Sequence, residues 1–163
     1  MGDCEKEIEL LRKLWDKNLF DERVYINATM HSKNLFIKSF FNKLRYRKHS
    51  FGLKIRNQIS NLEKELIISG KEIEEKSTDT RIEKNISLLP LFRFEKDELI
   101  KECYRREKAN LKHCNDLLSQ LYKGYLRELL LSQIHEIRLS LHEIKSMGIK
   151  TYEESEEEVR TIS

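Results

Sequence analysis

Two glutamates and two histidines are the residues of this sequence whose types and spacing could do chemistry. Glu22 and Glu107 each fall on the apolar stripe of an expected helix, and His135 and His142 lie two turns apart on another. Carboxylates and imidazoles bind iron and other divalent metals in the oxidase-type centres of helical bundles. These four residues are therefore the candidate metal ligands.

The full di-metal motif is absent from the sequence. Such a centre takes one Glu from each of two helices and a Glu-x-x-His pair from each of the other two, because positions i and i+3 share a helix face. The residues three positions before the five histidines are Ala28, Tyr46, Asn110, Ser132 and Leu139. We therefore expect a degenerate or absent metal site and no cofactor, with iron or another divalent metal as the alternative.

A structural role is the other interpretation of the two glutamates. A carboxylate inside a bundle must be paired, hydrogen-bonded, protonated or metal-bound, because an isolated buried charge costs several kcal/mol. Ion pairs with Arg47, Lys48 or Arg138, or a side chain that reaches the bundle edge, would meet this requirement. We favour this interpretation over metal binding because the metal motif is incomplete.

A basic run with interleaved aromatic residues is the main candidate for an interaction surface. Its members are Lys43, Arg45, Arg47, Lys48, His49, Lys54 and Arg56, with Tyr46 and Phe51 between them. The run winds around a helix, and 31 basic against 28 acidic residues leave a net charge of only +3. A nucleic-acid binder usually has a stronger or more segregated excess. We expect a solvated helix face and no nucleic acid, with an adaptor for an acidic partner as an alternative.

Composition predicts an all-α protein. The chain has 163 residues, 39% of them hydrophobic and 36% charged, with one proline and five glycines. This balance is typical of long amphipathic helices, which bury one stripe each, and the length allows one domain with a core of its own. No nucleophile elbow, P-loop or dinucleotide fingerprint occurs, so the sequence leans away from an enzyme.

Cysteine usage and hydropathy indicate the compartment. Cys4, Cys103 and Cys114 are odd in number and widely spaced, so they provide neither a disulfide framework nor a paired metal motif. No apolar run approaches the roughly 20 residues of a membrane span, and the first residues are too polar for a signal peptide. We expect a soluble, cytoplasmic protein that does not enter the membrane.

Hydrophobic spacing of three and four residues predicts four helices. They cover residues 5–30, 33–69, 95–122 and 125–147, with Ser32 as the N-cap of the second helix and Gly70 as its stop. Short turns within pairs and a long link between them predict two αα-hairpins joined by a crossover, an up-down four-helix bundle over residues 1–150. Residues 151–163 form an acidic, solvated tail.

The chain resembles a bacterial family of ferritin-like four-helix-bundle proteins known as a domain of unknown function. The resemblance extends from about residue 11 to residue 147. It is carried by Lys17-Asn18, Glu22, Tyr25, Asn27, Ala28, Ser39-Phe40-Phe41, Phe51-Gly52, the stretch from Glu102 to Ala109, and Gln133, Ile137 and His142. It implies a ferritin-like arrangement of the helices.

Departures from this family shape the functional expectation. Arg106 stands where the family has glycine, and Lys112-His113-Cys114 replaces a carboxylate-rich run. These changes remove oxygen ligands, so we expect a non-catalytic intracellular structural or interaction protein with a degenerate metal site. A metal-binding or oxidase-type protein and a helical adaptor remain the alternatives. A homodimer is the expected assembly, because long Phe- and Leu-rich stripes often leave one seam uncovered.

Overall fold

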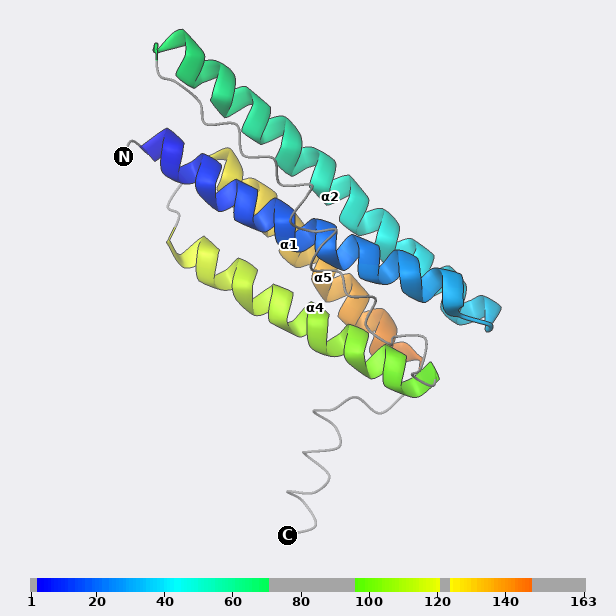
Figure 1. The fold of residues 1–163 in the computed structure, drawn as a ribbon. Coiled ribbons are helices and arrows are strands. Elements are labelled where there is room, and N and C mark those ends of the chain that lie inside the picture. The colour runs from blue at the N-terminus through cyan, green and yellow to red at the C-terminus, as the bar shows by residue number, and fades with distance from the viewer. Residues whose placement is uncertain (1–2, 71–95, 121–123, 148–163) are drawn as a thin grey trace. The chain divides into compact units, whose positions relative to one another are not determined.

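A computed structural model describes residues 3–70, 96–120 and 124–147, and every regular element in these ranges is an α-helix (Figure 1). The helices are α1 (Asp3–His31), α2 (Leu35–Ile68), α4 (Lys96–Ser119) and α5 (Tyr125–Ser146). Over the described residues the expected all-α class is confirmed and the four expected helices are present, with ends displaced by at most three residues. The predicted crossover and the acidic tail lie outside the described residues.

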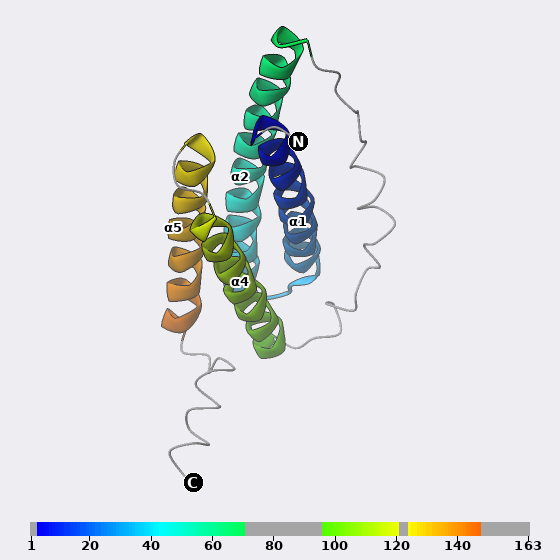
Figure 2. The ribbon, with the colours of Figure 1, turned by 90° about the vertical axis from the view of Figure 1, so that its left-hand side faces the viewer.

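The helices pair as two antiparallel hairpins, α1 with α2 and α4 with α5, and Figures 1 and 2 show each pair side by side. The chain divides into two compact units, Met1–Leu89 and Pro90–Ser163, which each contain one hairpin. The ferritin-like bundle that joins both hairpins stays a prediction.

The turn between α1 and α2 is held by Asn34. Its side-chain oxygen accepts hydrogen bonds from the backbone N–H groups of Phe36 at 2.9 Å and Ile37 at 3.2 Å. The expectation that Ser32 caps α2 is wrong, because its hydroxyl lies two residues earlier and donates to the Asn34 carbonyl at 3.4 Å. Asn34, directly before the first helical residue, is placed to satisfy the free N–H groups of the first turn.

The end of α2 follows the sequence expectation. Gly70 has a φ of +79°, in the left-handed region that glycine enters without a steric cost. Its N–H donates to the Ile67 carbonyl at 3.0 Å, and the Ser69 N–H donates to Glu65 at 3.1 Å. These bonds satisfy carbonyls of the last turn, so the helix stops where the glycine was expected to stop it.

The interior of the first hairpin combines aliphatic and aromatic side chains. Tyr25 of α1 stacks on Phe41 of α2 with ring centroids 6.1 Å apart. Trp15, Leu19 and Ile26 of α1 are only half-buried, because the inward face of the helix is rotated away from them. That inward face consists of Ile8, Leu11, Leu14, Asn18, Asp21, Val24, Tyr25 and Ala28.

The second hairpin has an aliphatic interior that includes two thiols. Cys103 and Cys114 of α4 are both buried. The buried aliphatic residues of α5 are Leu126, Leu129, Leu130, Ile134, Ile137, Leu141 and Ile144. Among the described residues, none of the helices has the length and apolarity needed to cross a membrane.

Candidate functional site

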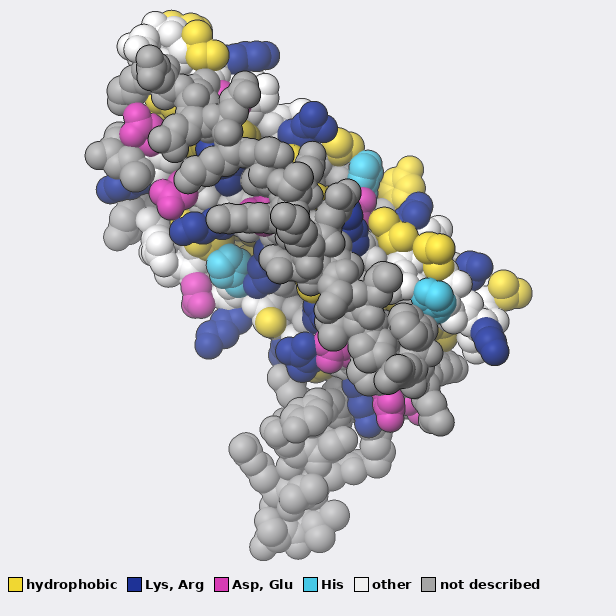
Figure 3. All heavy atoms as spheres, viewed as in Figure 1, with side chains coloured by type: hydrophobic (Ala, Val, Ile, Leu, Met, Phe, Trp, Pro, Cys, Tyr) yellow, Lys and Arg dark blue, Asp and Glu magenta, His cyan; other side chains and the backbone are white. Residues whose placement is uncertain are grey.

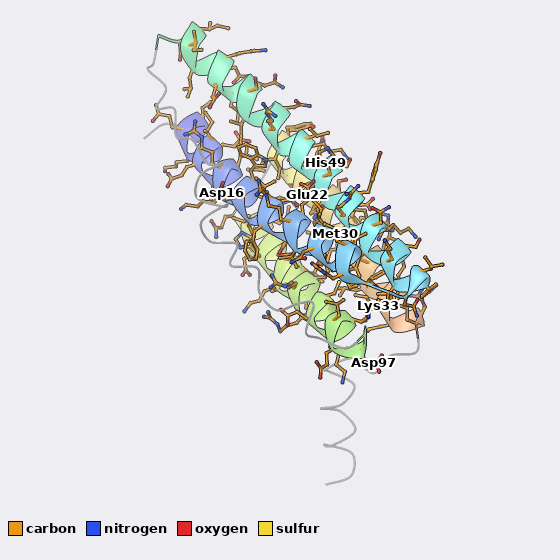
Figure 4. All side chains as sticks on the ribbon, turned by 45° about the vertical axis from the view of Figure 1, so that its right-hand side comes forward. Asp16, Glu22, Met30, Lys33, His49 and Asp97 are labelled. Atoms are coloured by element: carbon orange, nitrogen blue, oxygen red, sulfur yellow. The ribbon has the colours of Figure 1, made fainter. Side chains whose placement is uncertain are left out.

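Glu22 is bound within its own hairpin. Its carboxylate Oε1 lies 2.9 Å from Nδ1 of His49, so the contact joins α1 to α2 (Figure 4). The Glu22 side chain is 13% exposed and that of His49 is 58% exposed. The carboxylate therefore sits at the rim of the hairpin with an imidazole at its outer side. The edge position was one of the alternatives left open by the sequence, and His49 was not among the predicted partners.

Three further polar side chains lie inside the first hairpin. Asn18 and Asp21 of α1 and Lys48 of α2 are all buried. The Asn18 amide nitrogen donates to the Lys48 backbone carbonyl at 2.7 Å. Gly52 leaves the space for this contact, because a Cβ at that position would stand 3.1 Å from the same nitrogen. The hairpin thus buries three polar side chains, and the described bond among them joins the Asn18 amide to the backbone of Lys48.

The burial of Asn18 and Asp21 was not predicted from the sequence. Their positions continue the buried spacing from Leu11 and Leu14 to Tyr25, three or four residues at a time. That spacing was the signal that could have found them. Asn and Asp usually lie on the solvent-exposed face of a helix, so the residue types at these positions argued against burial.

The second hairpin also contains a buried carboxylate. Glu107 of α4 is 1% exposed, and Asn110, one turn later on the same face, is buried as well. Gln133 is the buried amide of α5. The expected inward position of Glu107 is confirmed. A buried carboxylate and two amides provide oxygen and nitrogen atoms that could hold a polar ligand or stabilise one another.

A surface ion-pair network lies earlier on α4. The Arg105 Nε lies 3.0 Å from Oε2 of Glu102, and the Arg106 Nε lies 3.2 Å from Oε1. The hydrogen bond from Arg105 is the main reason why the pKa of Glu102 is lowered, and it outweighs the opposing effect of burial. Arg106, the residue in place of the family's glycine, thus pairs with the glutamate one turn before it.

The two candidate histidines do not reach the interior. His135 and His142 are both exposed on α5. Within either hairpin, the described residues contain no group of three or more His, Cys, Asp or Glu side chains that could hold a metal ion. The structure therefore places Glu107 inside and Glu22 at a rim. The metal role of Glu22, Glu107, His135 and His142 stays a prediction.

The basic run of α2 distributes around the helix, as the sequence predicted. Lys48 and Phe51 are buried, and Arg45 and Arg47 are half-buried. The remaining members, Lys43, Tyr46, His49, Lys54 and Arg56, are exposed. Only part of the run is therefore available to a partner.

No protein-family model, curated protein or solved structure matches the chain. The resemblance to ferritin-like proteins therefore stays an expectation based on the sequence motifs alone.

Proposed function

We propose that this chain is a non-catalytic intracellular protein with a structural or interaction role, built on a helical bundle whose metal site is degenerate. The observation that carries the proposal is the Glu22–His49 contact of 2.9 Å. A carboxylate that would be a metal ligand is instead engaged by a side chain of its own hairpin. The role of such a contact is to hold α1 and α2 in register.

The residues that carry the family resemblance support a packing role. Most of those in the first hairpin fill its interior, and the Tyr25–Phe41 stack and the Asn18–Gly52 approach are two examples. The buried members are Asn18, Tyr25, Ala28, Phe40, Phe41, Phe51 and Gly52. A pattern made of interior residues describes how a hairpin packs more directly than it describes a reaction.

Metal binding is the second candidate, and Glu107 is the observation that favours it. Glu107 is 1% exposed, and a buried carboxylate is a residue type that ligates divalent cations. Under this alternative Glu107 would act with Glu22 and with His135 or His142.

Metal content decides between the two candidates. The full untagged chain is reconstituted anaerobically with iron(II), manganese(II) or zinc(II), and bound metal is measured by mass spectrometry. If the metal site is degenerate, the chain should bind no stoichiometric metal. One or two ions per chain, lost in Glu22→Gln/Glu107→Gln but kept in Glu102→Gln, would establish the metal-binding alternative. Glu102→Gln is the matched control because it removes a carboxylate from the same helix, α4, and circular dichroism verifies that each variant is folded.

A further inference from the structure

Two large apolar side chains are exposed at the turn end of the first hairpin. Leu35 and Phe36 are the first two residues of α2, and their exposed fractions are 82% and 64%. The side chains of an α-helix lean toward its N-terminus, so both of these lean toward the turn. Met30, labelled in Figure 4, is in the last turn of α1 and is 71% exposed at the same end. We call Leu35 and Phe36 the apolar tip.

The chain on both sides of this turn is strongly basic. Residues 23–62 include nine Lys and Arg residues and no Asp or Glu, although the whole chain has a net charge of only +3. Lys33 and Lys38, next to the apolar tip in the chain, are both exposed. Figure 3 shows hydrophobic, basic and His side chains at the end of the first hairpin where Figure 1 places the turn. Apolar side chains and lysines therefore occupy the same end of the hairpin.

The opposite end of α2 has a similar apolar pair in a different charge environment. Ile67 and Ile68 are exposed by 63% and 86%. Glu63 and Glu65, with Lys64 between them, lie within five residues before this pair. An exposed apolar pair is therefore found at both ends of α2. Only the pair at the turn combines it with a surrounding stretch that contains no acidic residue.

We propose that the apolar tip docks the first hairpin on an anionic lipid surface. Leu35 and Phe36 would enter the headgroup region, and Lys33 and Lys38 would lie beside the anionic groups of the lipids. Lys38 follows Leu35 by about 5 Å along the helix, which is within the Debye length of about 8 Å at physiological salt. The contact is peripheral, so the body of each helix stays outside the bilayer. The inference rests on the proposed interaction role and names the partner.

Shape and charge favour a lipid surface over other occupants. A partner helix binds in a groove, whereas the apolar tip is the end of a helix. A nucleic acid would pair its phosphates with the lysines but would leave Leu35 uncovered. A second copy would bring two lysine-rich ends together, which costs binding energy. An anionic bilayer accommodates apolar side chains and lysines next to one another.

The test measures binding of the full chain to large unilamellar vesicles by sedimentation, in buffer that contains EDTA. One kind of vesicle contains phosphatidylcholine alone, and in the other about one third of the lipid is phosphatidylserine. We expect binding to the anionic vesicles to be at least tenfold tighter and to weaken as the salt concentration rises.

Two double variants separate the apolar and the charged contributions to vesicle binding. Leu35→Gln/Phe36→Gln should weaken it by about tenfold or more, because it removes the apolar contact and leaves the charge unchanged. Lys33→Gln/Lys38→Gln should also weaken it by about tenfold or more, because each lysine near an anionic surface contributes roughly fivefold.

The opposite end of the hairpin provides the matched controls. Ile67→Gln/Ile68→Gln removes an exposed apolar pair from the same helix. Lys6→Gln/Lys64→Gln removes two exposed lysines. Both control variants should bind anionic vesicles as tightly as the unchanged chain, and circular dichroism verifies that every variant is folded.

Entry of the apolar tip into the headgroup region has its own measurement. The sequence contains one tryptophan, Trp15, so Trp15→Phe/Leu35→Trp moves this fluorophore to the tip. Brominated lipids in anionic vesicles should quench its fluorescence. Trp15→Phe/Ile68→Trp places the fluorophore at the other end of α2, where the same lipids should leave the fluorescence unchanged.

Several results would overturn the proposal. They are equal binding to both kinds of vesicle, no binding to the anionic vesicles, equal losses in the tip and control variants, and no quenching of the tryptophan at the tip. Release from anionic vesicles by an equal mass of single-stranded RNA or of an acidic helical peptide would assign the tip to that class of partner instead. A dimer that Leu35→Gln/Phe36→Gln dissociates in analytical ultracentrifugation would assign it to a second copy.

Vesicle binding and metal content test different statements. EDTA keeps metal out of the vesicle experiment, so a failure to bind lipid leaves the structural role standing. Stoichiometric metal after reconstitution would refute the degenerate metal site, whatever the vesicles show.

Discussion

Asn18 of α1 lies directly against Gly52 of α2. The amide nitrogen of Asn18 reaches the Lys48 carbonyl at 2.7 Å, and a Cβ on Gly52 would stand 3.1 Å from that nitrogen. The backbone carbonyl of Lys48 thus accepts a bond from the facing helix where glycine leaves room for it. The two residues should behave as one unit when they are substituted.

Gly52→Ala should have opposite effects with and without Asn18. Alanine in a helix interior is worth about 1 kcal/mol over glycine, so in the Asn18→Ala background the change should stabilise the hairpin by about that amount. With Asn18 present the new methyl displaces a buried hydrogen bond worth about 1 kcal/mol, which cancels or reverses the gain. Urea unfolding followed by circular dichroism gives the coupling free energy. Equal effects in both backgrounds would show that the two residues do not interact.

Asn34→Ala should destabilise the chain by about 1 kcal/mol, because it leaves two N–H groups of the first turn of α2 without their side-chain acceptor. Asn34→Asp should retain most of the stability, since its carboxylate can accept the same bonds. Ser32→Ala serves as the control and should cost little, because its hydroxyl donates to a carbonyl at 3.4 Å. Thermal unfolding of the three variants orders them. A larger loss in Ser32→Ala than in Asn34→Ala would contradict the assignment of the cap.

Glu102 should make stability depend on pH in the acid range. Its pKa is lowered in the folded chain, chiefly by the hydrogen bond from Arg105. Because this pKa is lower in the folded chain than in the unfolded chain, the Glu102 carboxylate stabilises the fold. Its contribution is complete above the unfolded-state pKa and is lost as the pH falls through the folded-state pKa. Glu102→Gln should flatten this part of the pH profile, by no more than about 1 kcal/mol because the pair is screened by solvent. Denaturant midpoints between pH 2 and 6 provide the measurement, and an unchanged slope would refute the role of the pair.

Ionisation of Glu7 should lower the stability of the chain, which is opposite to the effect of Glu102. Burial raises its pKa, and the nearby Glu65 carboxylate adds to the effect. Its ionisation therefore costs stability as the pH rises from the unfolded-state pKa through the folded-state pKa. Glu7→Gln should stabilise the chain at pH 7 by at most about 0.5 kcal/mol, since the group is mostly solvated. This gain in stability should vanish at pH 3, because Glu7 is then protonated and as neutral as the glutamine that replaces it. A loss of stability at pH 7 would show that the Glu7 charge is favourable.

The four helices could be predicted because each carries a long apolar pattern with a period near 3.6 residues. The apolar pattern did not determine the first and last residues of each helix. Ser32 and Asn34 are both capping residue types, and only the backbone geometry of the turn shows which of them precedes the first helical residue. Gly70 was predictable because only glycine enters the left-handed region without a steric cost.

The candidate site was predictable only in part. Glu107 lies inside because its neighbours on the stripe are apolar, and the pattern shows this directly. The contact of Glu22 with His49 joins residues 27 positions apart, and local spacing contains no information on it. Asp21 was missed for another reason: charged side chains are seldom fully buried, so its residue type argued against an interior position.

The short turn at residues 32–34 has a consequence for how the first hairpin forms. Only three residues separate the two helices, so bringing α1 against α2 costs little loop-closure entropy. Helix formation and the closing of such short loops both take about a microsecond or less. The Asn34 cap and the Tyr25–Phe41 stack lie close to this turn in the chain, so they are available early. The first hairpin should therefore nucleate at the turn and close toward its free ends, in the manner of fast-folding helical proteins.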